Sequence, residues 1–387
     1  MPSITHNRCR TTILLIFALA LTFAEAVSAQ DYKEVHPGVE YAQVSRVIDG
    51  KNVNFNLLRL DLNKVRLDVV HAMDSAIGTE TTSSLAKRHN AVAAINAGFF
   101  RLDNSIFAGD AAGVLMIDRK LLSESFKDRT ALMISNTKEG SEVTIRRLSV
   151  YPELSFRKRI TTISGIDRER KADEIIAYTP EFNTTTLTET SGVEVVVRHN
   201  RITAIRDGTW NTKIPCDGFV LSATGTARTR LLSQVKVGQW ASIAISVMRR
   251  LSVGSGIWIS MGLYGKKDLE MTNGVPRLIR DGKIDITWKE EEASKEFVET
   301  RHPRTAVANL KDGKFLMLTA DGRSEASGGI DLYDLADFLL ELGAVDALNL
   351  DGGGSTTMVL DGKVVNHPSD KGGERKIGDA LIVTLRK

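Results

Sequence analysis

The segment from Asp331 to Thr357 places the strongest constraint on how this chain can fold. Its first part predicts a helix over 331–342, because apolar residues recur there at helical spacing and define one buried stripe: Leu332, Leu335, Ala336, Leu339 and Leu342. Asp331 can cap the start of that helix, and Gly343 can end it. The apolar run 347–350 then predicts a buried strand, which leads directly into Asp351 and three glycines.

The rest of the chain reads mainly as strands. Strand-like runs occupy 53–60, 65–70, 91–95, 193–198, 202–205, 219–221 and 242–247, and a short helix is expected over 83–89. Residues 137–190 are rich in charge and threonine, so we expect an irregular or inserted region there, with edge strands and long loops. These patterns predict an α+β fold of strand-rich mixed sheets with a few helices. No Pro/Gly/Ser linker divides residues 30–387, which are expected to form one domain.

The N-terminus has the pattern of a secretory signal peptide over residues 1–29. Arg8 and Arg10 precede the apolar run 13–23, and the small residues 27–29 suit cleavage by a signal peptidase. A retained N-terminal anchor is the alternative, although the run is short for a membrane span. Later segments offer no candidate span, so the mature protein is expected in the periplasm or the extracellular space.

Charge and cysteine content narrow the classes of partner. The formal net charge is +3, and removal of the leader takes away a net +1, which leaves +2. Nucleic acid is therefore not the expected partner, because binding to a phosphate backbone favours a basic excess. The mature chain keeps one cysteine, Cys216, which cannot form an internal disulfide and is expected to be buried.

The glycine-rich segment 351–357 is the strongest candidate for chemistry. Three adjacent glycines cost backbone entropy, so they suit a place where the backbone approaches a ligand. Their amides could form an anion-binding nest, to which Ser355 and Thr356 would add hydroxyl groups and Asp351 a carboxylate. The alternative is a purely structural role, in which the glycines form a tight turn between two strands. The segment lacks the lysine of a nucleotide P-loop and the flanking pattern of a hydrolase nucleophile elbow.

Three further segments place polar residues at predicted strand ends. Arg304 follows a proline and could present a fixed guanidinium to a phosphate, although a surface arginine is the commoner reading. Asp321, Gly322 and Arg323 follow the apolar run 315–319, where an Asp-Gly turn is also common. Asn96 follows the strand ending at 95 and could bind a sugar hydroxyl, or it could be a turn residue. The histidines show no spacing typical of a metal site.

Taken together, four segments resemble the phosphodiester glycosidase family: 94–100 (AINAGFF), 303–306 (PRTA), 321–323 (DGR) and 349–358 (NLDGGGSTTM). They occur in the family's order, and the resemblance covers roughly residues 37–386. It implies a hydrolase that cleaves a sugar 1-phosphodiester in a glycan or cell-envelope phosphosugar polymer. It assigns catalysis to Asp351, Asp321, Arg304 and Asn96. It assigns substrate and phosphate binding to Thr305, Gly322, Arg323, Gly352, Gly353, Gly354, Ser355 and Thr356.

The role of each residue is a hypothesis at this stage. Arg304 would hold the phosphate together with the amides of 352–354, and Asp351 or Asp321 would activate water or stabilise the sugar cation. The metal ligands stay unassigned, although a divalent cation such as Ca²⁺ or Mg²⁺ would suit the carboxylates. The alternative is a non-catalytic envelope module that binds phosphosugar polymers, because the same arginine and glycine loop would serve it.

Overall fold

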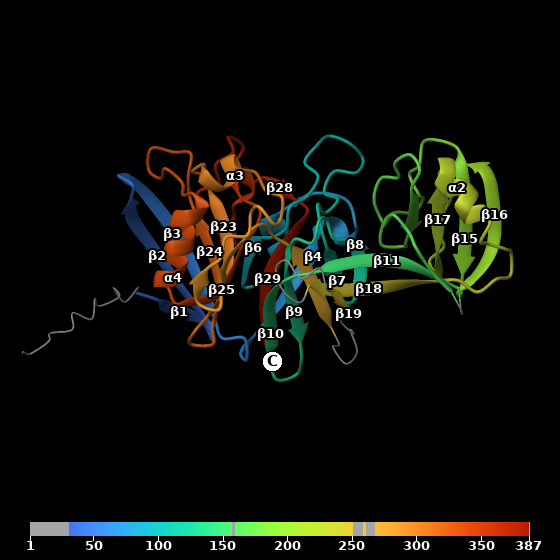
Figure 1. The fold of residues 1–387 in the computed structure, drawn as a ribbon. Coiled ribbons are helices and arrows are strands. Elements are labelled where there is room, and N and C mark those ends of the chain that lie inside the picture. The colour runs from blue at the N-terminus through green and yellow to red at the C-terminus, as the bar shows by residue number, and fades with distance from the viewer. Residues whose placement is uncertain (1–30, 157–158, 251–257, 261–267, 387) are drawn as a thin grey trace, which may run out of the picture. The chain divides into compact units, whose positions relative to one another are not determined.

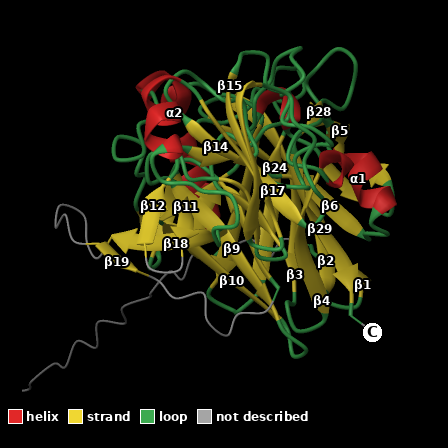
Figure 2. Ribbon diagram, turned by 90° about the vertical axis from the view of Figure 1, so that its right-hand side faces the viewer, coloured by secondary structure: helices red, strands yellow, loops and turns green. Residues whose placement is uncertain are grey.

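The computed structural model describes residues 31–156, 159–250, 258–260 and 268–386. The predicted leader at 1–29 lies outside these residues. Strands dominate the described part of the chain and helices are few (Figure 2), which confirms the predicted strand-rich fold. None of the helices in these ranges has the length and apolar composition needed to cross a membrane.

The largest sheet has eight strands, and its neighbouring strands all pair antiparallel. Their order is β1 (Lys33–His36), β2 (Val39–Ile48), β3 (Lys51–Leu60), β24 (Phe315–Ala320), β23 (Arg304–Leu310), β25 (Ala344–Asn349), β21 (Arg277–Arg280) and β22 (Lys283–Ile284).

Helix α4 (Leu332–Glu341) packs against this sheet beside β24 and β25 (Figure 1). Its predicted stripe is buried in one core cluster with Ala306, Leu316 and Ala347. The alternate residues of the same strands, Val307 and Met317, face a second core cluster. The sheet is therefore covered on both faces, which explains why its central strands read as continuous apolar runs. Asp331 caps α4 by accepting hydrogen bonds from the N–H groups of residues 333 and 334, as predicted.

The second sheet supplies the other half of the site. Its order is β27 (Lys363–Val364), β26 (Met358–Leu360), β6 (Ala93–Asn96), β29 (Asp379–Leu385) and β4 (Val65–His71). Helix α1 (Thr82–Arg88) packs Leu85 and Ala86 against it. Helix α3 (Lys295–Glu299) precedes β23, and the short pair β28 (Lys376–Ile377) and β5 (Glu80–Thr81) forms a separate ladder.

Three more sheets complete the described chain. One contains β10 (Ser141–Arg147), β9 (Thr130–Asn136), β20 (Leu269–Asn273), β7 (Leu115–Ile117) and β8 (Lys120–Ser123). Another contains β12 (Arg159–Thr162), β11 (Ser149–Phe156), β18 (Ser242–Arg250) and β19 (Trp258–Ser260). The last contains β13 (Gly165–Ile166), β14 (Ile175–Tyr178), β17 (Gly218–Ala223), β15 (Gly192–Arg198) and β16 (Arg201–Thr209), with α2 (Gly225–Leu232) after β17.

Two sequence expectations differ from the structure. Residues 137–190 hold five strands; β10, β12 and β13 are edge strands, but β11 and β14 lie inside their sheets, so the region is more regular than expected. Whether it is an insertion stays a prediction. Cys216 is exposed and not buried, because it lies in the turn before β17 while Ile214 takes the buried position.

Candidate active site

The register of the largest sheet brings the predicted residues to one edge. β23 pairs with β24 so that Arg304 lies opposite Ala320, and it pairs with β25 so that Ala306 lies opposite Asn349. Asp321 and Asp351 therefore leave their strands at the end of the sheet where Arg304 begins β23. From the second sheet, β6 ends there at Asn96, whose side chain reaches the segment after β25.

Asn96 joins the two sheets. Its Nδ2 donates to the carbonyl of Asp351 at 2.6 Å, and its Oδ1 accepts from Thr305 Oγ1 at 2.8 Å and from Thr357 N at 3.1 Å. The side chain is 1% exposed. Asn96 and Thr305 thus position the glycine loop, and their hydrogen bonds are made to the protein.

The loop 351–357 does not form the predicted nest of free amides. The N–H of Gly353 donates to the carbonyl of Pro303 at 2.8 Å, and that of Gly352 donates to Asp351 Oδ1 at 2.9 Å. The amides of Ser355 and Thr356 donate to carbonyls within the loop. Glycine is required for space: a Cβ on Gly352 would lie 2.8 Å from the Pro303 carbonyl oxygen.

Two hydroxyls of the loop are left without partners. Ser355, Thr356 and Thr357 are at most 1% exposed; the Ser355 hydroxyl interacts with the Asp351 carboxylate, whereas those of Thr356 and Thr357 make no hydrogen bond. Because an unpaired buried polar group costs about 1–3 kcal/mol, two adjacent ones need an explanation. A bound oxyanion or sugar hydroxyl would satisfy them, so these orphan hydroxyls mark the loop as a ligand site.

Asp351 is the carboxylate closest in sequence to these hydroxyls. Burial raises the pKa of its carboxyl to about 6, against the lowering effects of the Ser355 hydroxyl, the Gly352 N–H and Arg375. The residue as a whole keeps partial exposure. Its carboxyl is therefore mostly ionised at pH 7 but can take a proton near neutrality, which suits a general base.

Asp321 is tied to the same loop through Asn366. Its Oδ1 accepts from the His367 N–H at 3.0 Å and from Asn366 Nδ2 at 3.2 Å, and Asn366 Nδ2 also reaches the Thr356 carbonyl at 3.0 Å. Burial raises the pKa of Asp321, and these two hydrogen bonds oppose the rise. Gly322 is buried where a Cβ would lie 2.8 Å from the Pro303 nitrogen, so it serves close packing.

Arg304 differs from its predicted role. The side chain is 1% exposed; Nε donates to the Ile330 carbonyl at 3.2 Å, and Nη2 donates to the carbonyls of Phe297 and Thr300 at 2.7 and 2.8 Å. Burial lowers its pKa to about 10. Only Nη1 is left for a phosphate, so Arg304 supports the loop as a fixed buried charge, and its removal would disturb the fold.

Two other arginines approach the loop from its surface. Arg323 is exposed and lies 3.2 Å from His302 through Nη2 and Nδ1, and a Cβ on Gly353 would lie 3.1 Å from that Nη2. Arg375 forms a bidentate ion pair with Asp370 at 2.8 and 3.0 Å, and both side chains lie against Gly354. Gly353 and Gly354 thus make room for two guanidinium groups.

Arg375 was missed by sequence reasoning. The available signal was a pair of opposite charges, Asp370 and Arg375, around the turn glycines 372–373. That pattern is common on surfaces, and nothing local connects it with the glycine loop.

A group of three carboxylates suited to a cation does occur in the described chain, but not at the loop. Oxygens of Asp49, Asp331 and Asp334 lie within 4.8 Å of one another. Arg301 lies 3.1 Å from Asp334 and 3.6 Å from Asp49, and Asp331 caps α4. Arg301 and the N-terminus of α4 therefore offset part of their charge within the protein.

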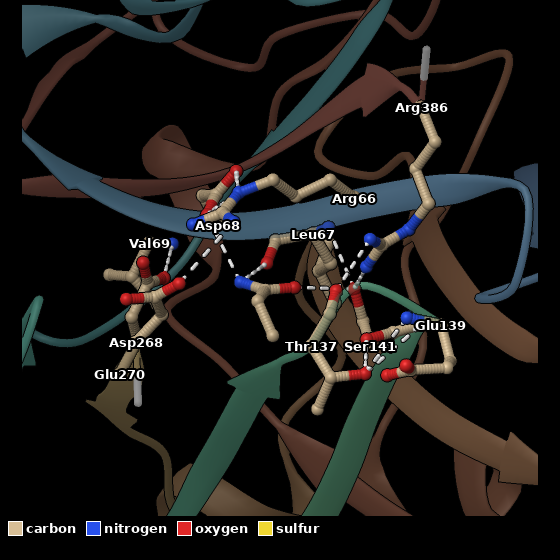
Figure 3. Close-up of polar contacts among 12 residues, drawn as sticks. Arg66, Leu67, Asp68, Val69, Thr137, Glu139, Ser141, Asp268, Glu270 and Arg386 are labelled. Atoms are coloured by element: carbon tan, nitrogen blue, oxygen red, sulfur yellow. Dashed lines mark hydrogen bonds and ion pairs between the residues drawn. The ribbon is translucent and has the colours of Figure 1, made fainter. Parts of the chain in front are cut away.

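A second buried polar centre involves β4, β9 and β20 (Figure 3). Glu270 accepts from the Val69 N–H, and Arg66 Nε donates to both oxygens of Asp68 at 2.8 and 2.9 Å. Burial first, and then the Asp68 charge, raise the pKa of Glu270 to about 9. Asn136 donates to Asp68 at 3.1 Å, so this centre connects three strands.

Comparisons with known proteins identify the family of this chain. A family model described as phosphodiester glycosidase matches residues 191–384, half of the chain. The matched range contains Arg304, Asp321 and Asp351, whereas Asn96 lies before it.

Relatives share parts of the chain. The N-acetylglucosamine-1-phosphodiester alpha-N-acetylglucosaminidase of Bos taurus is 39% identical over 111 residues, which cover 26% of this chain and 21% of that protein. A prophage-derived uncharacterised protein of Bacillus subtilis is 33% identical over 144 residues, covering 37% of this chain and 19% of that one. The chain thus spans about a fifth of the length of these relatives.

A solved structure shows the same fold. The crystal structure of a hypothetical protein from Synechocystis matches with a TM-score of 0.74 and 22% identity, covering 93% of this chain and 64% of that one. At this identity the likeness concerns the fold alone.

Proposed function

This chain belongs to the phosphodiester glycosidase family, and we propose that it is an exported hydrolase that cleaves a sugar 1-phosphodiester in a glycan or cell-envelope phosphosugar polymer. One observation carries the proposal. Asn96, Arg304, Asp321 and Asp351 come from separate segments and meet around one loop, in which the buried hydroxyls of Thr356 and Thr357 have no partner in the protein.

The proposed reaction breaks the bond between the anomeric carbon and the phosphate oxygen. Water attacks that carbon and gives its proton to the Asp351 carboxylate, while the phosphomonoester leaves with the electron pair of the broken bond. Arg323 and Arg375 would balance the charge on the phosphate, and the hydroxyls of 355–357 would donate to its oxygens. Asp321 would stabilise positive charge on the sugar ring.

Binding of a divalent cation such as Ca²⁺ or Mg²⁺ at the loop is part of the proposal, but no step of the proposed reaction depends on it. Asp370 is paired with Arg375, and one oxygen of Asp321 is taken by two hydrogen bonds. The protein groups at the loop would therefore need phosphate oxygens and water to complete the coordination of a hard cation. Loss of turnover on chelation, with recovery on adding either ion, would support such a site.

The direct test is hydrolysis of a synthetic sugar 1-phosphodiester with a chromogenic group on its phosphate. Release of free sugar in the absence of other enzymes supports the proposal. Saturable binding without any product would instead favour the non-catalytic envelope module. Reaction in ¹⁸O-labelled water separates attack at carbon from attack at phosphorus, because the label enters the sugar in the first case and the phosphate in the second.

Export is a second part of the proposal, and it rests on the leader pattern at 1–29. N-terminal sequencing of the protein recovered from outside the cytoplasm should begin at Gln30. A full-length chain retained in the cytoplasm would contradict it.

A further inference from the structure

A cavity of about 600 Å³ has Ala112 in its wall, next to residues 97–99, which are hydrogen-bonded to the glycine loop. Four stretches of chain line it: 110–113, 123–126, Arg129, and the charged run 168–174, together with Arg101. Its volume falls within the roughly 300–1,000 Å³ range of small-molecule sites, enough for one or two sugar rings.

Phe99 connects this cavity with the candidate active site. The Phe99 carbonyl accepts from the N–H of Ala112, in the cavity wall, at 2.7 Å. Two residues earlier, the Ala97 carbonyl accepts from the Asp351 N–H at 2.9 Å. The Phe99 ring meets Phe297 edge-on at 6.1 Å, and Phe297 carries the Arg304 guanidinium on its face. A ligand that extends from the loop past Phe99 would therefore meet the cavity.

Most of the charges in the wall are already paired. Arg168 binds Glu124 at 2.6 Å and Glu174 at 2.8 Å, and Arg101 binds Glu169. These pairs fix the wall, and they leave little charge for a ligand.

Besides the exposed Lys171, two more deeply placed groups in the wall form no ion pair among the described residues. Arg129 is half-buried, donates through Nε to the Glu291 carbonyl at 3.2 Å, and forms no ion pair with any carboxylate among the described residues. Asp110 has a buried Oδ1 without a hydrogen-bond partner. Burial first, and then Glu124, raise the pKa of Asp110 to about 7, so its carboxyl can either accept or donate at neutral pH.

These two groups define the chemistry of the ligand. The free edge of a guanidinium matches a carboxylate or a phosphate, and a carboxyl with an open oxygen matches a sugar hydroxyl. Phe126 is 46% exposed at the cavity, and the Arg129 guanidinium lies over its ring at 4.8 Å, so Phe126 holds Arg129 in place at the cavity wall.

We infer that this cavity, which we call the Arg129 cavity, binds a sugar ring that carries a carboxylate or a phosphate. It accepts the part of the substrate that lies beyond the cleaved phosphodiester. The binding of an anionic sugar ring is inferred from the cavity itself. The assignment of that ring to the substrate rests on the proposed function.

The test is calorimetric titration of the full chain with glucuronate, glucose 6-phosphate and glucose. We expect both anionic probes to bind at least about tenfold more tightly than glucose, since a charge-assisted hydrogen-bond pair is worth about one such factor or more. Arg129→Gln should remove that preference. Asp110→Asn should weaken all three probes, and it provides an independent variant if Arg129→Gln folds poorly.

Two controls locate the binding. Arg206→Gln changes an exposed arginine on β16 and should leave every affinity unchanged. Gly354→Ala disturbs the glycine loop and should leave glucuronate binding intact. If glucuronate binding is lost in Gly354→Ala but kept in Arg129→Gln, glucuronate binds at the glycine loop and the inference is wrong. Glucose binding as tight as that of the two anionic probes would also overturn the inference.

The outcome is independent of whether the proposed function holds. If the chain cleaves the chromogenic phosphodiester but shows no Arg129-dependent binding, the sugar site in the Arg129 cavity is refuted. The proposed glycosidase function is then still supported. Arg129-dependent binding in a chain that cleaves no sugar phosphodiester would keep the cavity as a sugar site and overturn its assignment to this substrate.

Discussion

Replacing Asp351 by asparagine should make the protein more stable and less active at once. Burial raises the pKa of this carboxyl from 3.8 to about 6. A shift of about two units corresponds to about 3 kcal/mol by which the fold disfavours the ionised form. Asparagine keeps an Oδ1 that can accept from the Gly352 N–H but carries no charge, so it avoids this cost.

The pH dependence has a defined sign. The folded pKa lies above the unfolded value, so below about pH 4 both states are protonated and Asp351 costs nothing. The cost appears as the pH rises from about 4 to 6 and is complete above about 6. The gain in unfolding free energy of Asp351→Asn over wild type should therefore grow from near zero at pH 4 to about 3 kcal/mol at pH 8.

Urea denaturation between pH 4 and 8 measures this gain, with Asp337→Asn, an exposed carboxylate on α4, as the matched control. Turnover should move the other way: loss of a general base costs about a hundredfold or more. In wild type, kcat/KM should fall about tenfold between pH 7 and 5 as Asp351 takes up its proton. A variant that is less stable than wild type at pH 8, or a gain that does not change with pH, would refute the reasoning.

Other predictions concern the loop and the core. In Gly354→Ala the added Cβ displaces the Arg375 guanidinium, so kcat/KM should fall about tenfold, while Gly372→Ala, where a Cβ meets nothing within 4 Å, should match wild type in the same assay. Thr356→Val removes a buried hydroxyl that has no partner, so turnover should drop while the urea midpoint holds or rises; a large loss of stability would show that the hydroxyl is bonded in the free protein. Leu339→Ala opens a cavity under α4 and should cost about 2–5 kcal/mol in urea denaturation, with kcat unchanged in the folded protein; a cost below about 1 kcal/mol would mean that the helix packs loosely.

Local pattern was enough to predict the elements that carry the site. The helix over 331–342 has its cap, its buried stripe and its terminating glycine all between Asp331 and Gly343, so α4 follows from sequence alone. The strands that lead to Asn96, Asp321 and Asp351 are short apolar runs, and each ends within one residue of the predicted position. The order of motifs also identified the family, because motif residues are read without knowing their contacts.

Local pattern could not give the state of each side chain once the segments met. Arg304 looks like an exposed phosphate ligand beside its proline, yet the carbonyls of Phe297, Thr300 and Ile330 surround it, and they come from two other segments. The loop amides looked free, yet Pro303, just before β23, lies alongside and its carbonyl accepts from the Gly353 N–H.

The sequence by itself determined helix α4 and the short strands that lead to the site residues, because periodicity and caps act over a few positions. Only the tertiary structure decided that Arg375 contacts the glycine loop, that Asn96 hydrogen-bonds the two sheets together, and that the hydroxyls of Thr356 and Thr357 stay unpaired. Those outcomes depend on strand register and on burial against distant segments, and neither is encoded within the local spacing of residues.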